Sequence, residues 1–217
     1  MPNQRNYQKE MEKSIEEFTK EGKVPSLLLH SCCAPCSSYV LETLSENFRI
    51  TVFYYNPNIY PEEEYWKRVK EQEIFIRRLP VRYPVTFLEG IYEKDRFYQA
   101  VKGLEKEPEG GERCSVCFRL RLGEAVKEAV NGNFDYVTTT LTISPLKNAQ
   151  KLNEIGEELC REQSVIWLPS DFKKKNGYKR STELSKEYGM YRQDYCGCVY
   201  SVRSMNRNCI LSQIGLA

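Results

Sequence analysis

Short apolar runs rich in β-branched residues alternate along this chain with longer segments of helical periodicity. The runs end in polar or turn-forming residues, as buried parallel strands do. We expect strands at 24–33, 49–59, 83–90, 134–143 and 164–171. The segments before and between them predict helices at 4–22, 37–48, 61–79, 93–104, 115–132 and 148–163. Alternating strands and helices indicate an α/β fold, with a mostly parallel sheet and helices on both faces.

The chain contains no internal repeat and no clear linker, so we expect a single α/β domain over residues 1–217. Residues 1–23 are expected to form an N-terminal helical extension, and residues 172–217 a basic C-terminal segment. Ser37 or Ser38 is the expected cap of the second helix. No run of about 18 apolar residues occurs, which excludes a membrane-spanning helix. The polar first residues do not resemble a secretory signal, so we expect a cytoplasmic protein.

Several strands are followed by segments that carry chemically active residues. HSCCAPC follows the first strand, YNPNIYP the second, TTTLTISP ends the fourth and PSDFKKK ends the last. Ligands of open α/β sheets bind beyond the carboxyl ends of the strands, so these segments should converge on one crevice. Neither a G-x-x-x-x-G-K-[ST] loop nor a G-x-G-x-x-G fingerprint is present, which argues against ATP-driven chemistry and a nicotinamide cofactor there.

The nine cysteines are clustered in a way that a disulfide scaffold does not explain. Such scaffolds are typical of short secreted chains, whereas clustered thiols in a reducing compartment indicate metal or redox chemistry. Cys160 and Cys209 stand alone and are expected to be packing residues. The other seven form three groups: Cys32, Cys33 and Cys36; Cys114 and Cys117; Cys196 and Cys198.

The first two cysteine groups predict a metal centre. Adjacent cysteines chelate one tetrahedral ion poorly but can bind two corners of a polynuclear cluster, so four thiolates from two segments suit [4Fe–4S]. The alternative is a structural zinc site, with Cys33 and Cys36 as one C-x-x-C pair and residues 114–117 as the other. Spacing alone leaves both open. Cys36 either binds an additional iron, contacts substrate or is a small buried residue.

The Cys196-Gly197-Cys198 sequence predicts a redox-active pair, because a disulfide between residues two apart is strained and easily reduced. A second metal site and two idle thiols are the alternatives. His30 is the only histidine; it either donates a proton near the site or is a buried structural residue. Asp171, at the end of the last expected strand, is either a general acid or an ordinary surface carboxylate.

Charge is distributed unevenly along the chain. Residues 172–207 contain nine Lys or Arg against three Asp or Glu, a net +6, so the rest of the chain carries −4 of the total +2. A basic segment of this kind suits a polyanion such as RNA, although a solvated surface is the alternative. The candidate phosphate contacts are Lys173, Lys174, Lys175, Lys179 and Arg180.

Four segments, in order, resemble the QueH-type epoxyqueuosine reductases: LLLHSCCAPCSS, ERCSVCFRLRL, TTTLTISPLKN and YRQDYCGC. The resemblance runs from about Leu27 to Cys198. It implies a Rossmann-like fold of the adenine nucleotide alpha hydrolase type. It also implies an oxidoreductase that reduces the epoxide of epoxyqueuosine in tRNA to queuosine with loss of water, the last step of queuosine biosynthesis. The implied partners are this tRNA and an unknown electron donor.

The resemblance also implies roles for the cysteines, and it favours a [4Fe–4S] cluster over zinc. Cys36 stands where a ligand of an additional iron is expected, and Cys196 and Cys198 where a redox-active disulfide is expected. The implied cluster ligands are Cys32, Cys33, Cys114 and Cys117. Two other functions are the alternatives. One is a zinc- or cluster-stabilised tRNA-binding protein, and the other is a tRNA thiolation enzyme, against which the missing phosphate-binding loop counts.

Overall fold

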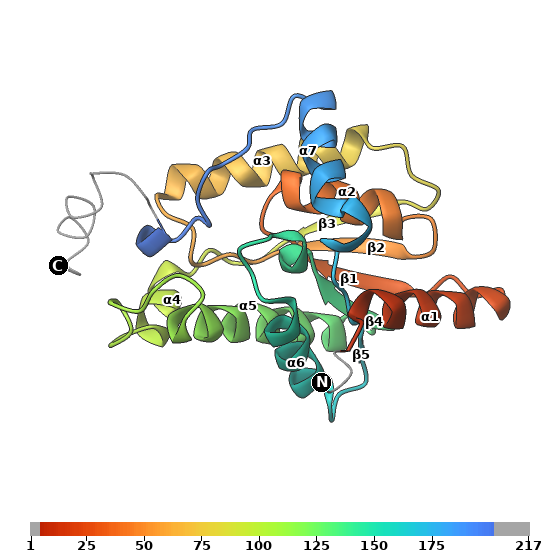
Figure 1. The fold of residues 1–217 in the computed structure, drawn as a ribbon, viewed down its shortest axis with the longest axis horizontal. Helices are drawn as coiled ribbons and strands as arrows, with labels where there is room; N and C mark the ends of the chain where they lie inside the picture. Colours follow the sequence, from red (N-terminus) through yellow and green to blue (C-terminus); the bar gives the residue numbers. More distant parts are fainter. Residues whose placement is uncertain (1–4, 202–217) are drawn as a thin grey trace.

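A five-stranded parallel sheet forms the centre of the computed structural model, which describes residues 5–201 (Figure 1). The strands are β1 (Ser26–His30), β2 (Arg49–Tyr54), β3 (Val85–Glu89), β4 (Tyr136–Thr139) and β5 (Ile166–Trp167). The α-helices are α1 (Tyr7–Lys20), α2 (Ala34–Leu44), α3 (Glu62–Arg78), α4 (Lys94–Ala100), α5 (Glu112–Asn131), α6 (Ala149–Cys160) and α7 (Gly177–Glu187). Within the described residues, the short 3₁₀ helices are η1 (Thr140–Ile143), η2 (Lys174–Asn176) and η3 (Val199–Ser201).

The strand order is β3-β2-β1-β4-β5, and every neighbouring pair is parallel. This order confirms the predicted α/β class and is that of a Rossmann-like sheet. The chain winds outward from β1 in one direction and from β4 in the other, so the connections after these two strands diverge. A crevice therefore forms beyond the carboxyl ends of β1 and β4, where His30 pairs with Thr139.

Two apolar layers cover the sheet, and β1 contributes to both because successive side chains point to opposite faces. Leu27 and Leu29 pack in a cluster with buried residues of α1, α2 and α3. Leu28 packs in the other cluster, against α5 and α6. Figure 1 shows α2, α3 and α7 on one side of the sheet and α5 and α6 on the other. Both faces of the central strand are thus buried, which fixes the position of its carboxyl end.

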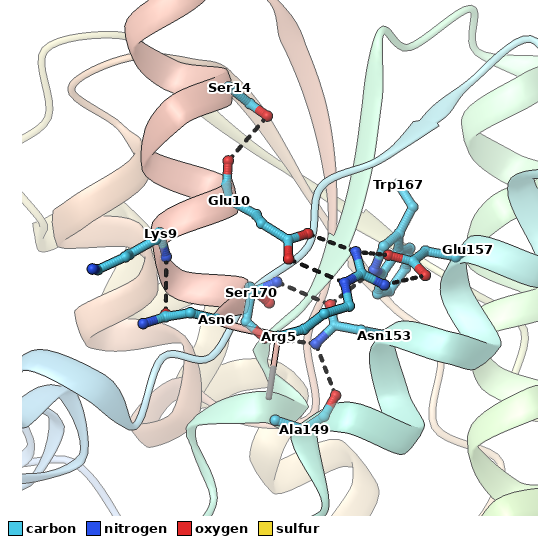
Figure 2. A network of polar contacts seen from close by, with 10 residues as sticks. All are labelled: Arg5, Asn6, Lys9, Glu10, Ser14, Ala149, Asn153, Glu157, Trp167 and Ser170. Atoms are coloured by element: carbon cyan, nitrogen blue, oxygen red, sulfur yellow. Dashed lines mark hydrogen bonds and ion pairs between the residues drawn. The ribbon is translucent and has the colours of Figure 1, made fainter. Parts of the chain in front are cut away.

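The N-terminal helix is attached to the body of the protein by apolar and by charged contacts. Met11 and Phe18 of α1 are buried in the same cluster as β1. Arg5, just before α1, forms ion pairs with Glu10 at 2.6 Å and with Glu157 of α6 at 2.8 Å (Figure 2). Such exposed ion pairs contribute up to about 1 kcal/mol each, so the buried apolar contacts supply most of the attachment.

Figure 2 also shows how α6 is joined to the segment after the last strand. The buried Asn153 side chain accepts hydrogen bonds from Trp167 Nε1 at 3.0 Å and from the Ser170 backbone at 2.9 Å. Its amide nitrogen donates to the carbonyl oxygens of Ala149 and Ser170, both at 2.8 Å. All hydrogen-bonding capacity of this buried amide is used, as a buried polar group requires.

Helix α2 begins three residues earlier than the sequence predicts, and the predicted caps were wrong. Cys33 occupies the N-cap position, and neither Ser37 nor Ser38 caps the helix. Pro35 fits the first turn, where a missing N–H costs nothing, so the helix can start directly after Cys33. This earlier start places Cys33 and Cys36 together in the first turn.

The fourth and fifth strands are shorter than predicted. β4 ends at Thr139, whose hydroxyl accepts a hydrogen bond from the Leu141 backbone at 3.2 Å and turns the chain into η1. β5 has only two residues, Ile166 and Trp167. Among residues 5–201, no helix is both long enough and apolar enough to cross a lipid bilayer.

The basic segment contains a helix, α7, that the sequence pattern did not predict. α7 packs along α2, and its first residue, Gly177, lies against the ring of Tyr39. A Cβ at Gly177 would lie 2.0 Å from the Phe172 carbonyl oxygen and 2.4 Å from the Tyr39 ring. Only glycine allows this approach. α7 is therefore held close to the helix whose first turn carries the cysteines.

Candidate redox and metal site

The first cysteine group lies at the carboxyl end of β1. The thiols of Cys32, Cys33 and Cys36 lie within 4.8 Å of one another, and the Cys32 and Cys33 sulfurs are 3.8 Å apart. Within residues 5–201, no other cluster of three His, Cys, Asp or Glu side chains meets the same distance. Three soft sulfur donors at this separation suit zinc or iron.

Buried hydrogen bonds hold the turn that carries these thiols. Ser31 donates to Gln72 of α3 at 2.8 Å, and Asn56 donates to the Ser31 carbonyl oxygen at 2.8 Å. The Tyr54 hydroxyl donates to the Cys32 carbonyl oxygen at 3.3 Å. The turn between β1 and α2 is therefore fixed by side chains from β2, from the loop after β2 and from α3.

The three thiols share their protons unequally. Hydrogen bonds from Cys33 and Cys36 lower the pKa of Cys32 well below its ordinary value. The same interaction with Cys32 raises the pKa of Cys33 to about 12 and raises that of Cys36 well above its ordinary value. Negative charge is thus concentrated on Cys32. The thiolate is the form that binds metals, so Cys32 is the thiol of this group best prepared to bind one.

The second cysteine group lies in the first turns of α5. The Gly110 backbone N–H donates to Cys114 Sγ at 3.2 Å, while Cys117 is buried one turn further on. Burial raises the pKa of Cys117 to about 12. Both cysteine groups thus lie at helix N-termini, where the helix dipole favours negative charge.

Arg121 joins the two groups. It is buried in α5 one turn after Cys117, and its guanidinium donates to the Asn56 side-chain oxygen at 2.5 Å. Burial alone would lower the pKa of Arg121, but the thiolates of Cys117 and Cys32 raise it. The positive charge of Arg121 therefore faces thiols from both groups and offsets the repulsion between them.

The third group, Cys196 and Cys198, is docked beside the start of α3. Gly197 between them has φ +115°, a conformation that favours glycine, and its carbonyl oxygen accepts from the Tyr60 backbone at 2.8 Å. Arg68 donates to the Cys196 carbonyl oxygen at 3.4 Å. Burial raises the pKa of Cys198 to about 11. Figure 1 shows this segment running back from α7 across α3 to reach its position.

Two adjoining cavities bring the three groups together. The larger has a volume of about 310 Å³ and is lined by Cys32, Cys36 and Cys196, among others. The smaller, about 20 Å³, is lined by residues 114, 117, 196 and 198, all cysteines. Lys147 and Cys196 line both cavities. The predicted convergence of strand-end segments is confirmed for the ends of β1, β2 and β4.

The end of the last strand does not join this convergence. Asp171 lies 2.9 Å from the Lys173 ammonium, and neither residue lines the two cavities. The Lys173 ammonium also donates to the Thr142 carbonyl oxygen at 2.9 Å. Both side chains therefore already have ion-pair or hydrogen-bond partners within the protein.

His30 is placed behind the cysteines rather than in a cavity. One ring nitrogen lies 2.9 Å from the Thr139 hydroxyl and the other 3.2 Å from the Tyr55 carbonyl oxygen. Burial lowers the pKa of His30 to about 3, so the ring is neutral near pH 7. These contacts match the structural alternative for this residue.

The predicted phosphate contacts divide into paired and unpaired residues. Lys175 forms an ion pair with Glu12 of α1 at 2.5 Å, and Arg180 forms one with Glu42 of α2 at 2.5 Å. Lys174 and Lys179 are exposed and form no ion pair with any described residue. Cys160 is buried in α6 and lines neither cavity, whereas Cys209 and residues 202–217 lie outside the described residues.

Sequence reasoning missed several residues that contact or face the thiols, among them Arg121, Lys147 and Gln193. Arg121 could have been found, because a residue four positions after Cys117 lies on the same face of a helix. Lys147 directly follows the strand-end segment TTTLTISPL, so the pattern that predicts the crevice also predicts a cation beside it. Gln193 donates to Cys33 Sγ at 2.9 Å across 160 residues, and no local pattern announces such a contact.

The donor set fits an iron–sulfur cluster. Four of the thiols come from two helix starts, and they are faced by the buried Arg121 and the half-buried Lys147. Arg121 Nε and Arg68 Nη2 are buried and have no hydrogen-bond partner among the described residues. Unpartnered donors beside thiols suit a site that is completed by an electron-rich group. The same thiols also satisfy the ligand requirement of zinc.

Comparison with known proteins identifies the family. The family model described as "Epoxyqueuosine reductase QueH" matches residues 27–204. The protein of that name from Streptococcus pyogenes serotype M1 is 45% identical over 93% of this chain and 80% of its own length. The protein of that name from Haemophilus influenzae is 39% identical over 83% of this chain and 73% of its own length. The one from Thermotoga maritima is 36% identical over 82% of this chain and 90% of its own length. This chain belongs to the QueH family of epoxyqueuosine reductases.

Proposed function

We propose that this protein reduces the epoxide of epoxyqueuosine in tRNA to the alkene of queuosine, the last step of queuosine biosynthesis. The observation that carries the proposal is the convergence of three cysteine groups on adjoining cavities at the carboxyl edge of the sheet. Reduction of an epoxide needs two electrons and two protons and releases water, and thiols with a metal can supply both. A cytoplasmic location, where tRNA is modified, is part of the proposal.

A [4Fe–4S] cluster is proposed to be held by Cys32, Cys33, Cys114 and Cys117. When bound, the cluster would supply one-electron transfer beside the substrate. Cys36, which lies within 4.8 Å of the first two thiols, is proposed as a ligand of an additional iron. The low pKa of Cys32 supports metal binding by this group, because the ligand form is already favoured.

Cys196 and Cys198 are proposed to cycle between dithiol and disulfide. Cys196 lines both cavities and Cys198 the smaller one, so this pair borders the larger cavity and shares the smaller one with the second cysteine group. The hydrogen bonds from Tyr60 and Arg68 to backbone carbonyl oxygens fix the segment without occupying either thiol. Oxidation to a disulfide releases the two electrons that one turnover requires, and an external electron donor, whose identity is not assigned, restores the dithiol.

The larger cavity is proposed to receive the modified base of an anticodon loop. Its volume of about 310 Å³ is at the lower end of the range of small-ligand sites. Tyr178, 43% exposed, lies at its lining, and the Arg192 guanidinium is 5.8 Å from the Tyr178 ring centre. An aromatic ring beside a cation is suited to an unstacked base and its phosphate. Lys174 of η2 and Lys179 of α7, both exposed and without an ion pair to any described residue, are proposed as further phosphate contacts.

The proposal is tested with the purified protein and tRNA from a strain that lacks this activity. The protein is reconstituted anaerobically with iron and sulfide, and nucleosides are quantified by mass spectrometry after reaction. We expect absorbance near about 400 nm from thiolate-bound iron–sulfur, and conversion of epoxyqueuosine to queuosine. Zinc in place of iron, together with tRNA binding but no conversion, would instead support a zinc-stabilised tRNA-binding protein.

A further inference from the structure

We propose that the Lys147 ammonium binds the epoxide oxygen of the substrate and stabilises the negative charge that develops on it during reduction. This inference rests on the proposed function and adds to it a catalytic residue outside the cysteine groups. It is carried by the position of Lys147, by the lack of a partner for its side chain and by the charge that the reaction creates.

Lys147 is placed where the two cavities meet. It lies in the short loop between η1 and α6, and its backbone N–H donates to the Ser144 carbonyl oxygen at 3.2 Å. Among residues 5–201, the others that line both cavities are Glu109, Leu146 and Cys196. Of these, Lys147 is the only one that can offer a positive charge. A substrate in the larger cavity can therefore lie beside both Lys147 and Cys196 of the redox pair.

The N–H donors of the Lys147 ammonium have no partner among the described residues. Its nitrogen forms no hydrogen bond and no ion pair with any of the described residues. The Lys147 side chain is half-buried. An ordinary lysine is cationic near pH 7, with three N–H donors available to a ligand.

Epoxide reduction creates charge on oxygen at this point. Both C–O bonds of the three-membered ring break, a carbon–carbon double bond forms, and the oxygen leaves as water after taking up two protons. The two electrons come from the proposed Cys196/Cys198 dithiol, which becomes a disulfide and releases two protons, so the reaction balances. After the first C–O bond breaks, the oxygen is an alkoxide. A fixed cationic donor lowers the energy of that species more than that of the neutral epoxide.

A purely structural role for Lys147 makes different predictions. If the ammonium only offset the thiolate charge, removing it would weaken metal binding, and Lys147→Arg would restore both metal and activity. If it binds the substrate oxygen, Lys147→Met keeps the metal and loses turnover. In that case Lys147→Arg restores activity poorly, because the planar guanidinium differs from the compact ammonium in reach and geometry.

The test compares Lys147→Met, Lys147→Arg and Lys147→Gln with the wild type, all purified with iron. Lys151→Met is the matched control, because it removes the same charge one helical turn later, in a groove between α5 and α6. Iron content, affinity for tRNA carrying queuosine, and single-turnover conversion of epoxyqueuosine are measured. We expect the single-turnover rate constant to fall about 10²–10³-fold in Lys147→Met, as for loss of one oxyanion donor. Iron content, tRNA affinity and the control variant should stay within about two-fold of wild type.

Other results would overturn the inference. Turnover of Lys147→Met and Lys147→Gln within about three-fold of wild type would show that the ammonium does not act on the oxygen. Loss of iron in both variants, with iron and turnover restored by arginine, would assign Lys147 to the metal site instead. If the wild type itself binds iron but forms no queuosine, the proposed function fails, and this inference fails with it for a distinguishable reason.

Discussion

The two edges of the sheet differ in how far their polar groups are paired. At the amino edge, the Asp135 carboxylate accepts from the Ser26 backbone at 2.8 Å and from its hydroxyl at 2.7 Å, while Ser26 accepts from the Asp135 backbone at 3.0 Å. At the carboxyl edge, several buried atoms have no hydrogen-bond partner among the described residues. These atoms are Asn58 Oδ1, Arg68 Nη2, Arg121 Nε and Gln193 Oε1.

This difference between the two edges indicates that the amino edge contributes to stability and the carboxyl edge to function. A closed set of hydrogen bonds joins β1 to β4 at the amino edge and holds the sheet together. The carboxyl edge places cations, thiols and unpartnered polar atoms in one region, an arrangement that is costly unless a further group binds there. We therefore expect substitutions at the carboxyl edge to remove activity with little effect on the fold, and substitutions at the amino edge to do the reverse.

The largest effect is expected from the cysteines of α5. In Cys114→Ser and Cys117→Ser an oxygen replaces a soft thiolate ligand, so iron, acid-labile sulfide and turnover should disappear together. Circular dichroism should stay close to that of wild type. Cys160→Ser is the control at a buried cysteine of α6, in the apolar cluster against which Cys114 packs. It should lower the free energy of unfolding by about 1–3 kcal/mol and keep the iron. Full iron and wild-type turnover in both α5 variants would disprove the ligand assignment.

A smaller and more selective effect is expected from the Cys-Gly-Cys segment. Cys196→Ser and Cys198→Ser should keep the iron, because these thiols are not proposed ligands, but should stop multiple turnover. A strong small-molecule reductant should partly restore turnover. Iron content, the disulfide state by mass spectrometry and turnover with and without that reductant are measured. Loss of iron in Cys196→Ser would show that the pair binds metal. Unchanged turnover with a physiological donor would show that the pair takes no part in electron transfer.

Charge reversal along η2 should weaken tRNA binding more moderately. Lys174→Glu should raise Kd and flatten its salt dependence, by about one unit of log–log slope for each phosphate that the protein no longer neutralises. Lys175→Glu should change binding less, because this lysine pairs with Glu12. Filter binding between low and moderate salt checks both, with single-turnover chemistry on bound tRNA as the control. Equal, wild-type binding by both variants would place the RNA surface elsewhere.

The smallest effect is expected at the amino edge. The Ser26 backbone hydrogen bond lowers the pKa of Asp135. A carboxylate with a lowered folded pKa stabilises the protein above its unfolded pKa of about 3.9, and this contribution disappears as pH falls through the folded value. Asp135→Asn should therefore cost up to about 1 kcal/mol near pH 7, since the side chain is exposed and screened, and less below about pH 4. Denaturant unfolding at both pH values checks this, and turnover should not change. A constant difference would show that the carboxylate charge does not contribute.

Local patterns predicted the sheet and the cysteine groups because both depend on near neighbours in sequence. Alternating apolar runs and helices imply the parallel order, and C-x-x-C spacing places two thiols on one helical turn. The unpredicted features depend on distant partners. Gln193 reaches Cys33, and Lys175 and Arg180 are paired with acids of α1 and α2. A charge count along the chain cannot reveal that these two cations are already paired.

The docking of the Cys196–Cys198 segment onto α3 also has a consequence for the order of events during synthesis. Proteins are made from the N-terminus, and domains begin to fold as they emerge. All five strands and five other cysteines, at 32, 33, 36, 114 and 117, are complete once Trp167 has been added to the chain. The proposed metal ligands are therefore available to one another before the redox pair has been translated. Arrival of the pair completes the lining of both cavities last, when Tyr60 and Arg68 bind its backbone carbonyl oxygens.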